Sequence, residues 1–118
     1  MTVKIVHTTT PDAVHVDNEV AKGVTGRVVI GAADGAPNFC MRRFDVTPGG
    51  HTPRHAHVWE HEIFFHAGRG EIFRLGEWVA VGPGDAAFVP GGEEHQIRNI
   101  GPEPLVFLCL IPSGAPEI

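Results

Sequence analysis

The chain has 118 residues, of which 42% are hydrophobic and 19% charged, a balance typical of one compact globular domain. Nine basic and fourteen acidic residues give a formal net charge of −5, and Arg42 and Arg43 are its only adjacent basic pair. This distribution excludes the basic surface that nucleic-acid binding requires. Since no stretch approaches the roughly 18 apolar residues of a membrane-crossing helix, we expect neither a nucleic-acid nor a membrane partner.

The two cysteines and the N-terminal residues indicate where the protein resides. Cys40 and Cys109 each lie in an apolar run, which favours two buried thiols over a disulfide or a metal clamp. The first residues lack the basic stretch followed by an apolar run that marks a secretory signal. We therefore expect a cytoplasmic protein.

Fifteen glycines and ten prolines divide the chain into short segments, which favours short strands joined by turns over long helices. Residues 12–22 are polar and ambiguous. The candidate strands cover residues 3–7, 24–30, 38–46, 61–66, 71–74, 77–81, 86–89, 95–99 and 105–111. Roughly nine to eleven short strands at this spacing predict an all-β sandwich or barrel, formed by one domain over residues 1–118.

Turn residues bound several of these strands. The run Pro48-Gly49-Gly50 is predicted to end the strand over 38–46, and Leu75-Gly76 predicts a short hairpin. The continuous apolar run over 105–111 suits a strand that is buried on both faces.

Histidine is the residue type out of proportion, with eight copies, five of them between His51 and His66. His55 and His57 are two residues apart, so on an extended backbone they project to the same face, and His61 keeps that parity. Neutral imidazole is the commonest metal ligand in proteins. An H-x-H pair also arises by chance in so histidine-rich a chain, so a second motif is needed to support a metal site.

The second motif lies over residues 84–99 and fits G-x5-P-x-G-x2-H-x3-N at every fixed position. Its glycines permit a tight turn and a sharp reversal, and Pro90 ends a strand. His95 is then expected to enter the next strand pointing inward. The Asn99 amide is expected to hold a neighbouring loop.

These two segments resemble the paired motifs of the cupin superfamily. The first family pattern, G-x5-H-x-H-x3,4-E-x6-G, spans about residues 49–70 here and is matched by its opening glycine and both H-x-H histidines, while its closing glycine is off by one residue. Residues 59–64 resemble small single-domain cupins in which a histidine replaces the usual carboxylate. The resemblance implies a double-stranded β-helix, or jelly-roll barrel, of antiparallel strands, with residues 1–37 as N-terminal strands or an arm.

The resemblance also implies one divalent transition metal, held by His55, His57, His61 and His95. Glu62 is the alternative to His61, because neighbours on a strand face opposite sides and only one of them can face the ion. Strand parity favours His61. Imidazole ligands leave manganese, iron, nickel, zinc and copper open as the metal.

Four neutral ligands would leave the full charge of the ion available to a bidentate, oxygen-rich and anionic small molecule. We expect either a dioxygenase-type oxidoreductase or an isomerase, lyase or decarboxylase acting through a metal-bound enolate; a non-catalytic sensor module is the alternative. No separate catalytic residue is identified. Trp59 and Phe107 are candidate pocket residues, with core packing as the alternative for both. By analogy with small cupins we expect a homodimer.

The remaining charged and imidazole side chains are less specific. Arg42 and Arg43 point to opposite faces, so one of them is a candidate for binding a carboxylate, and a solvated arginine is the alternative. The histidines outside the predicted ligand set are expected to be structural or solvated: His7, His15, His51 and His66.

Overall fold

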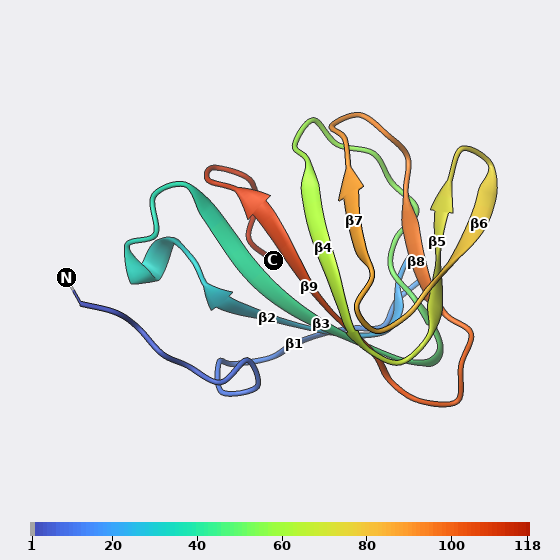
Figure 1. Cartoon of the computed structure of the whole chain (residues 1–118), viewed down its shortest axis with the longest axis horizontal. Coiled ribbons are helices and arrows are strands. Elements are labelled where there is room, and N and C mark those ends of the chain that lie inside the picture. Colours follow the sequence, from blue (N-terminus) through green and yellow to red (C-terminus); the bar gives the residue numbers. More distant parts are fainter. Residues whose placement is uncertain (1) are drawn as a thin grey trace.

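The structure is a computed structural model that describes residues 2–118, so Met1, the first residue of the predicted domain, lies outside the described residues. It consists of strands and one short 3-10 helix, η1 (Ala32–Asp34) (Figure 1). The strands of residues 2–118 are β1 (Val14–Val16), β2 (Lys22–Ile30), β3 (Phe39–His51), β4 (His61–Ala67), β5 (Gly70–Arg74), β6 (Glu77–Val81), β7 (Ala86–Val89), β8 (Gln96–Asn99) and β9 (Leu105–Pro112). This part of the chain contains no helix with the length and apolar character needed to cross a lipid bilayer.

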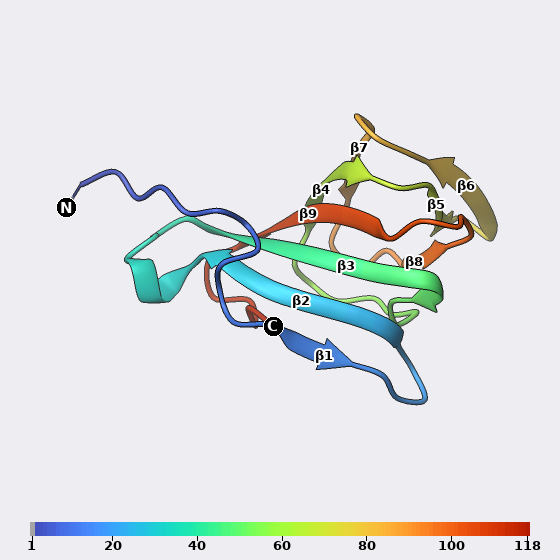
Figure 2. The ribbon, with the colours of Figure 1, turned by 90° about the horizontal axis from the view of Figure 1, so that it is seen from below.

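All strand pairs are antiparallel and belong to one curled sheet. Its order is β6-β5-β8-β3-β9-β4-β7, with β2 added alongside β3 and β1 alongside β2. The 13-residue β3 organises the sheet, since it pairs with β2, β8 and β9. Figure 2 shows β1, β2 and β3 on one side of the molecule and the shorter strands β5, β6 and β7 on the other. The all-β antiparallel architecture predicted from the sequence is confirmed.

One strand predicted within residues 2–118 is absent, and the predicted end of another is wrong. Residues 3–7 form no strand, because Val3 and Ile5 are 82% and 92% exposed and pair with no neighbouring strand. Conversely, β3 does not end at Pro48-Gly49-Gly50 but continues to His51. The register of its pairing with β2 shifts at this point, and Gly49 takes a φ of +81°. The proline and glycines therefore mark a β-bulge rather than a strand end.

The hairpin between β5 and β6 follows the prediction. Leu75 and Gly76 both have positive φ, 49° and 78°, as a type I′ turn of two residues requires. This turn places Arg74 opposite Glu77 and fixes the register of both strands.

The core lies between the two sides of the curled sheet. Val46, Phe65 and Leu105 are fully buried and come from β3, β4 and β9. In β9 the inward side chains are buried, whereas Leu108 and Leu110 on the outer face are only half-buried. The prediction that both faces of this strand are buried therefore holds for the inner face alone. One end of the core opens into a cavity that four histidines border.

Candidate metal centre

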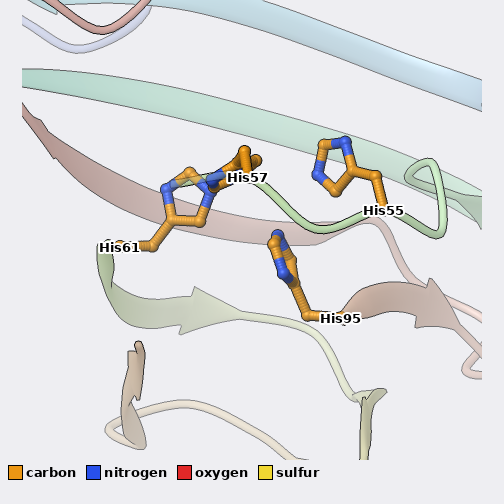
Figure 3. Close-up of side chains that lie close together, drawn as sticks. All are labelled: His55, His57, His61 and His95. Atoms are coloured by element: carbon orange, nitrogen blue, oxygen red, sulfur yellow. The ribbon is translucent and has the colours of Figure 1, made fainter. Parts of the chain in front are cut away.

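Three chain segments bring four imidazoles together. His55 and His57 lie in the irregular segment between β3 and β4, His61 opens β4, and His95 directly precedes β8 (Figure 3). An isolated antiparallel bridge joins His55 to His95, with N–O distances of 3.1 Å and 2.9 Å between their backbones. The two sequence motifs are thus held against each other by backbone hydrogen bonds.

The four side chains point toward one centre (Figure 3). Each histidine offers one ring nitrogen to the centre, and these four nitrogens all lie within 4.8 Å of one another. The sequence reasoning placed His55 and His57 on a regular strand, but apart from the single bridge at His55 the backbone there is irregular. Their convergence follows from the bend of this segment rather than from strand alternation.

Hydrogen bonds fix the ring nitrogens that face the centre. The Nδ1 atoms of His57 and His95 lie 2.8 Å and 2.9 Å from the carbonyl oxygens of Trp59 and Glu93. A carbonyl oxygen only accepts, so each Nδ1 carries the hydrogen and each Nε2 is left with a free lone pair. The Trp59 ring also stacks on His57, with centroids 4.2 Å apart, and holds its plane.

The arrangement of nitrogens fits a cation. His61 Nδ1 lies 3.2 Å from Cys109 Sγ, which can accept its hydrogen, and His61 Nε2 lies 2.8 Å from His57 Nε2. A hydrogen bond between these two nitrogens and a cation bound by both are alternative uses of the same pair. Their separation suits neighbouring ligands at the roughly 2.0–2.1 Å that imidazole nitrogen keeps from a zinc ion. The residues therefore fit a divalent transition metal, whose identity they leave open.

Burial keeps the imidazoles of His61 and His95 neutral and so able to bind a cation. Removal from water, assisted by the positive charge of Arg42, lowers the pKa of His61 to about 3. His55 is exposed at its outer edge, and partial desolvation, followed by the neighbouring histidines His95 and His57, lowers its pKa to about 4. Burial also lowers the pKa of His95, although its bond to the Glu93 carbonyl opposes the change. Protons therefore compete weakly with a metal ion at neutral pH.

Glu62, the alternative ligand, lies outside the cluster. Strand alternation in β4 buries His61 on the inner face at 6% exposure and turns Glu62 to the outer face. There Glu62 sits opposite Phe88 of β7 and Leu110 of β9. The cluster in the structure therefore consists of imidazoles alone.

The cluster borders a cavity of ≈ 250 Å³ with mainly apolar walls. Trp59 and Phe107, the two candidate pocket residues, both line it, together with Cys109. Sequence reasoning missed several further walls, because they come from segments that carry no motif. These are Val16, Ala21 and Val24 from β1, β2 and their connection, Phe44 from β3, and Pro116 and Ile118 from the C-terminal end, which returns against β2 (Figure 2).

The structure distinguishes the two adjacent arginines. Arg42 points into the cavity and is 8% exposed, whereas Arg43 points away and forms an ion pair with Asp45 at 2.9 Å. The pairing of Arg42 with Cys109 across β3 and β9 sets this facing. Which arginine faces the cavity is therefore set by the pairing of β3 with β9, a strand far along the chain.

The other histidines lie apart from the cluster. His66 is exposed on β4, and His51 at the end of β3 is half-buried, with its Nδ1 3.1 Å from the carbonyl oxygen of Thr52. His7 and His15 are exposed and hydrogen-bond to the hydroxyls of Thr9 and Thr25, respectively.

Known proteins share this architecture. The structure of the polyketide cyclase RemF from Streptomyces resistomycificus superposes with a TM-score of 0.86 and 38% sequence identity, covering 94% of this chain and 80% of that one. The 1-methylthio-D-xylulose 5-phosphate methylsulfurylase of Rhodospirillum rubrum is 37% identical over 71 residues, 60% of this chain and 46% of that protein. The oxalate-binding protein of Thermotoga maritima is 36% identical over 70 residues, 58% of each chain.

The chain thus spans about half the length of these two curated relatives. The family described as Cupin domain matches residues 42–111, more than half of the chain, and this region contains all four clustered histidines. The chain belongs to the cupin family.

Proposed function

We propose that this cupin is a metal-dependent enzyme that binds a β-dicarbonyl segment of an oxygen-rich, mainly apolar substrate and promotes carbon–carbon bond formation within it. The observation that carries the proposal is the position of four imidazoles at the wall of an apolar cavity. The likeness to the polyketide cyclase RemF over 94% of this chain supports the same reaction class.

The walls of the cavity favour this class of substrate. Val24, Phe44, Ile63 and Phe107 present hydrocarbon surface beside the imidazoles, which suits the carbon skeleton of a poly-β-ketone. A sugar phosphate would leave many hydroxyl groups against these walls without hydrogen-bond partners, at a cost in binding free energy. The apolar surface also displaces much of the water around the substrate, which strengthens each electrostatic interaction at the reacting atoms.

A divalent cation held by the four imidazoles would supply a Lewis acid that polarises carbonyl oxygens. The chain's own residues bind and orient the substrate around this point. Trp59 holds the plane of His57, and the backbone bridge between His55 and His95 fixes the relative position of the two motifs. The reaction is an isomerisation. A carbon between two carbonyls loses its proton to water and attacks a third carbonyl carbon of the same molecule. A proton then adds to the resulting alkoxide.

The test is turnover of a synthetic 1,3,7-triketone, in which attack of C2 on C7 closes a six-membered ring, by protein reconstituted with zinc, nickel, iron(II) or manganese. We expect a cyclised product with the mass of the substrate, or that mass less one water, and no oxygen consumption. Oxygen uptake would instead establish the dioxygenase-type reaction. His61→Ala is expected to abolish metal retention and turnover, whereas Glu62→Gln and the exposed His66→Ala retain both. Metal loss in Glu62→Gln and retention in His61→Ala would contradict the ligand assignment.

A second candidate is a non-catalytic module that retains a small anion. The observation in its favour is a cavity whose charged lining residue is the cationic Arg42, in a chain 36% identical over 70 residues to an oxalate-binding protein. Mass spectrometry of the purified protein would then detect a co-purified dicarboxylate. Metal-loaded protein would retain oxalate and leave the triketone unchanged.

A further inference from the structure

Arg42 carries a buried positive charge without a carboxylate partner. It is 8% exposed, and its Nε has no hydrogen-bond partner. Its Nη1 reaches the backbone carbonyl of Glu117 at 3.3 Å, and its Nη2 lies 3.1 Å from Cys109 Sγ and 3.4 Å from His61 Nδ1. The guanidinium carbon sits 5.0 Å from the centre of the Phe44 ring. These contacts position the side chain but do not balance its charge.

The ion pairs formed within residues 2–118 lie elsewhere. They join Lys4 to Asp34, Arg43 to Asp45 and Arg98 to Glu71, and Arg42 takes part in none of them. Burying a charge without a partner costs several kcal/mol, so such residues are rare unless a ligand supplies the missing charge. The adjacent Arg43 differs from Arg42 in this respect, because its positive charge is balanced by the carboxylate of Asp45.

The charge of Arg42 adds to that of the centre beside it. The other side chains that line the cavity in the described chain are apolar, hydroxyl, thiol or imidazole groups. An imidazole ligand carries no negative charge, so the four histidines do not offset the charge of a bound cation. An anionic oxygen is the group that this concentration of positive charge would bind most strongly.

We propose that Arg42 is a specificity-determining residue that makes the cavity selective for ligands carrying an anionic oxygen, an enolate or a carboxylate, over neutral ligands of the same shape. This inference rests on the proposed function, since it names the charge state in which the dicarbonyl substrate is bound. Guanidinium favours the anion because a charge-assisted hydrogen bond is about twice as strong as a neutral one. A bound anion would also supply the negative partner that the buried charge of Arg42 lacks.

The test compares two probes that differ in charge and little in shape, phenylglyoxylate and its neutral amide. Calorimetric titration of zinc-loaded wild-type protein should show tighter binding of the anion. In Arg42→Met we expect affinity for phenylglyoxylate to fall about tenfold or more, the order expected for a lost charge-assisted hydrogen bond, with affinity for the amide unchanged. Arg42→Lys retains the charge and should retain most of the anion affinity. Arg43→Met is the matched control and should behave as wild type.

Two further measurements separate a role in binding from one in structure. Zinc content of Arg42→Met should equal that of wild type, and its ligand-free form should resist urea at least as well, because the variant removes an unpaired buried charge. A fall in affinity for both probes together, or for neither, would overturn the inference.

The inference and the proposed function fail in different ways. If zinc-loaded wild-type protein binds neither probe and leaves the triketone unchanged, both are wrong. If it binds both probes and Arg42→Met leaves the anion preference intact, the inference alone is wrong. If Arg42→Met loses the anion selectively while wild type leaves the triketone unchanged, the inference holds and the cyclase proposal fails.

Discussion

Acidification should destabilise the metal-free protein well above the pH at which carboxylates titrate. In the folded state His61 is neutral, because burial and the nearby charge of Arg42 lower its pKa from 6.5 to about 3. In the unfolded chain the same imidazole takes up a proton below about pH 6.5. The unfolded state therefore binds more protons across this interval, and the free energy of unfolding falls as the pH falls.

The magnitude follows from the two pKa values. One unit of separation corresponds to about 1.4 kcal/mol, so at pH 4 His61 alone lowers the free energy of unfolding by about 3 kcal/mol relative to pH 7. The loss begins near pH 6.5 and ends once the folded-state pKa of about 3 is passed. His55, with a pKa of about 4, acts in the same direction, but its exposure to solvent reduces the effect.

The assay is urea unfolding of chelator-treated protein at about pH 7, 5.5 and 4, followed by circular dichroism. His61→Gln removes the titrating group and should flatten the pH dependence by about the amount assigned to it. His66→Gln is the control on the same strand, with its side chain exposed on the outer face. Equal stability of the wild type at pH 7 and 5.5, or an unchanged slope in His61→Gln, would refute the reasoning.

Three other changes test the metal site and the loops that support the fold. A zinc concentration about a hundredfold above its dissociation constant should raise the free energy of unfolding by about 3 kcal/mol, measured in calorimetric scans with and without chelator. Asn99→Ala should cost about 2–3 kcal/mol in urea unfolding, because the buried amide donates to the carbonyls of Val46 and Glu103 at 2.9 Å and 2.8 Å. Gly68→Ala should destabilise more than Gly84→Ala, because a Cβ on Gly68 would lie 2.2 Å from a carbonyl oxygen, whereas one on Gly84 meets open space; equal losses would contradict the reasoning.

Short-range patterns in the sequence predicted the parts of the molecule that short-range chemistry determines. The hairpin at Leu75-Gly76 follows from two residues that must adopt positive φ. The inward facing of His61 and the outward facing of Glu62 follow from alternation along β4. Asn99 bonds the carbonyls of Val46 and Glu103 and so holds the neighbouring loop, as its place in the second motif predicts.

Features that depend on long-range register were not predictable in the same way. The choice between Arg42 and Arg43 depends on the pairing of β3 with β9, about 65 residues further along the chain. The run Pro48-Gly49-Gly50 looks like a strand end from its residue types, and only the pairing of β3 with its neighbours shows that the strand continues through a bulge to His51. Val16 and Ile118 line the cavity, yet nothing in their local sequence distinguishes them from other apolar residues.

The residues around the cavity lie partly inside and partly outside the region that matches the family. All four clustered histidines and Arg42 lie within residues 42–111, the part that matches the family. Five lining residues lie outside it, namely Val16, Ala21, Val24, Pro116 and Ile118. The bridge between His55 and His95 holds the two motifs of the histidine cluster together, and these outer segments do not form it. Substitutions in the N-terminal strands and C-terminal end can therefore reshape the cavity without moving the imidazoles. Under the proposed function, this is a physical route by which one scaffold would accept different carbon skeletons, and it would place the determinants of substrate shape in the segments that carry no family motif.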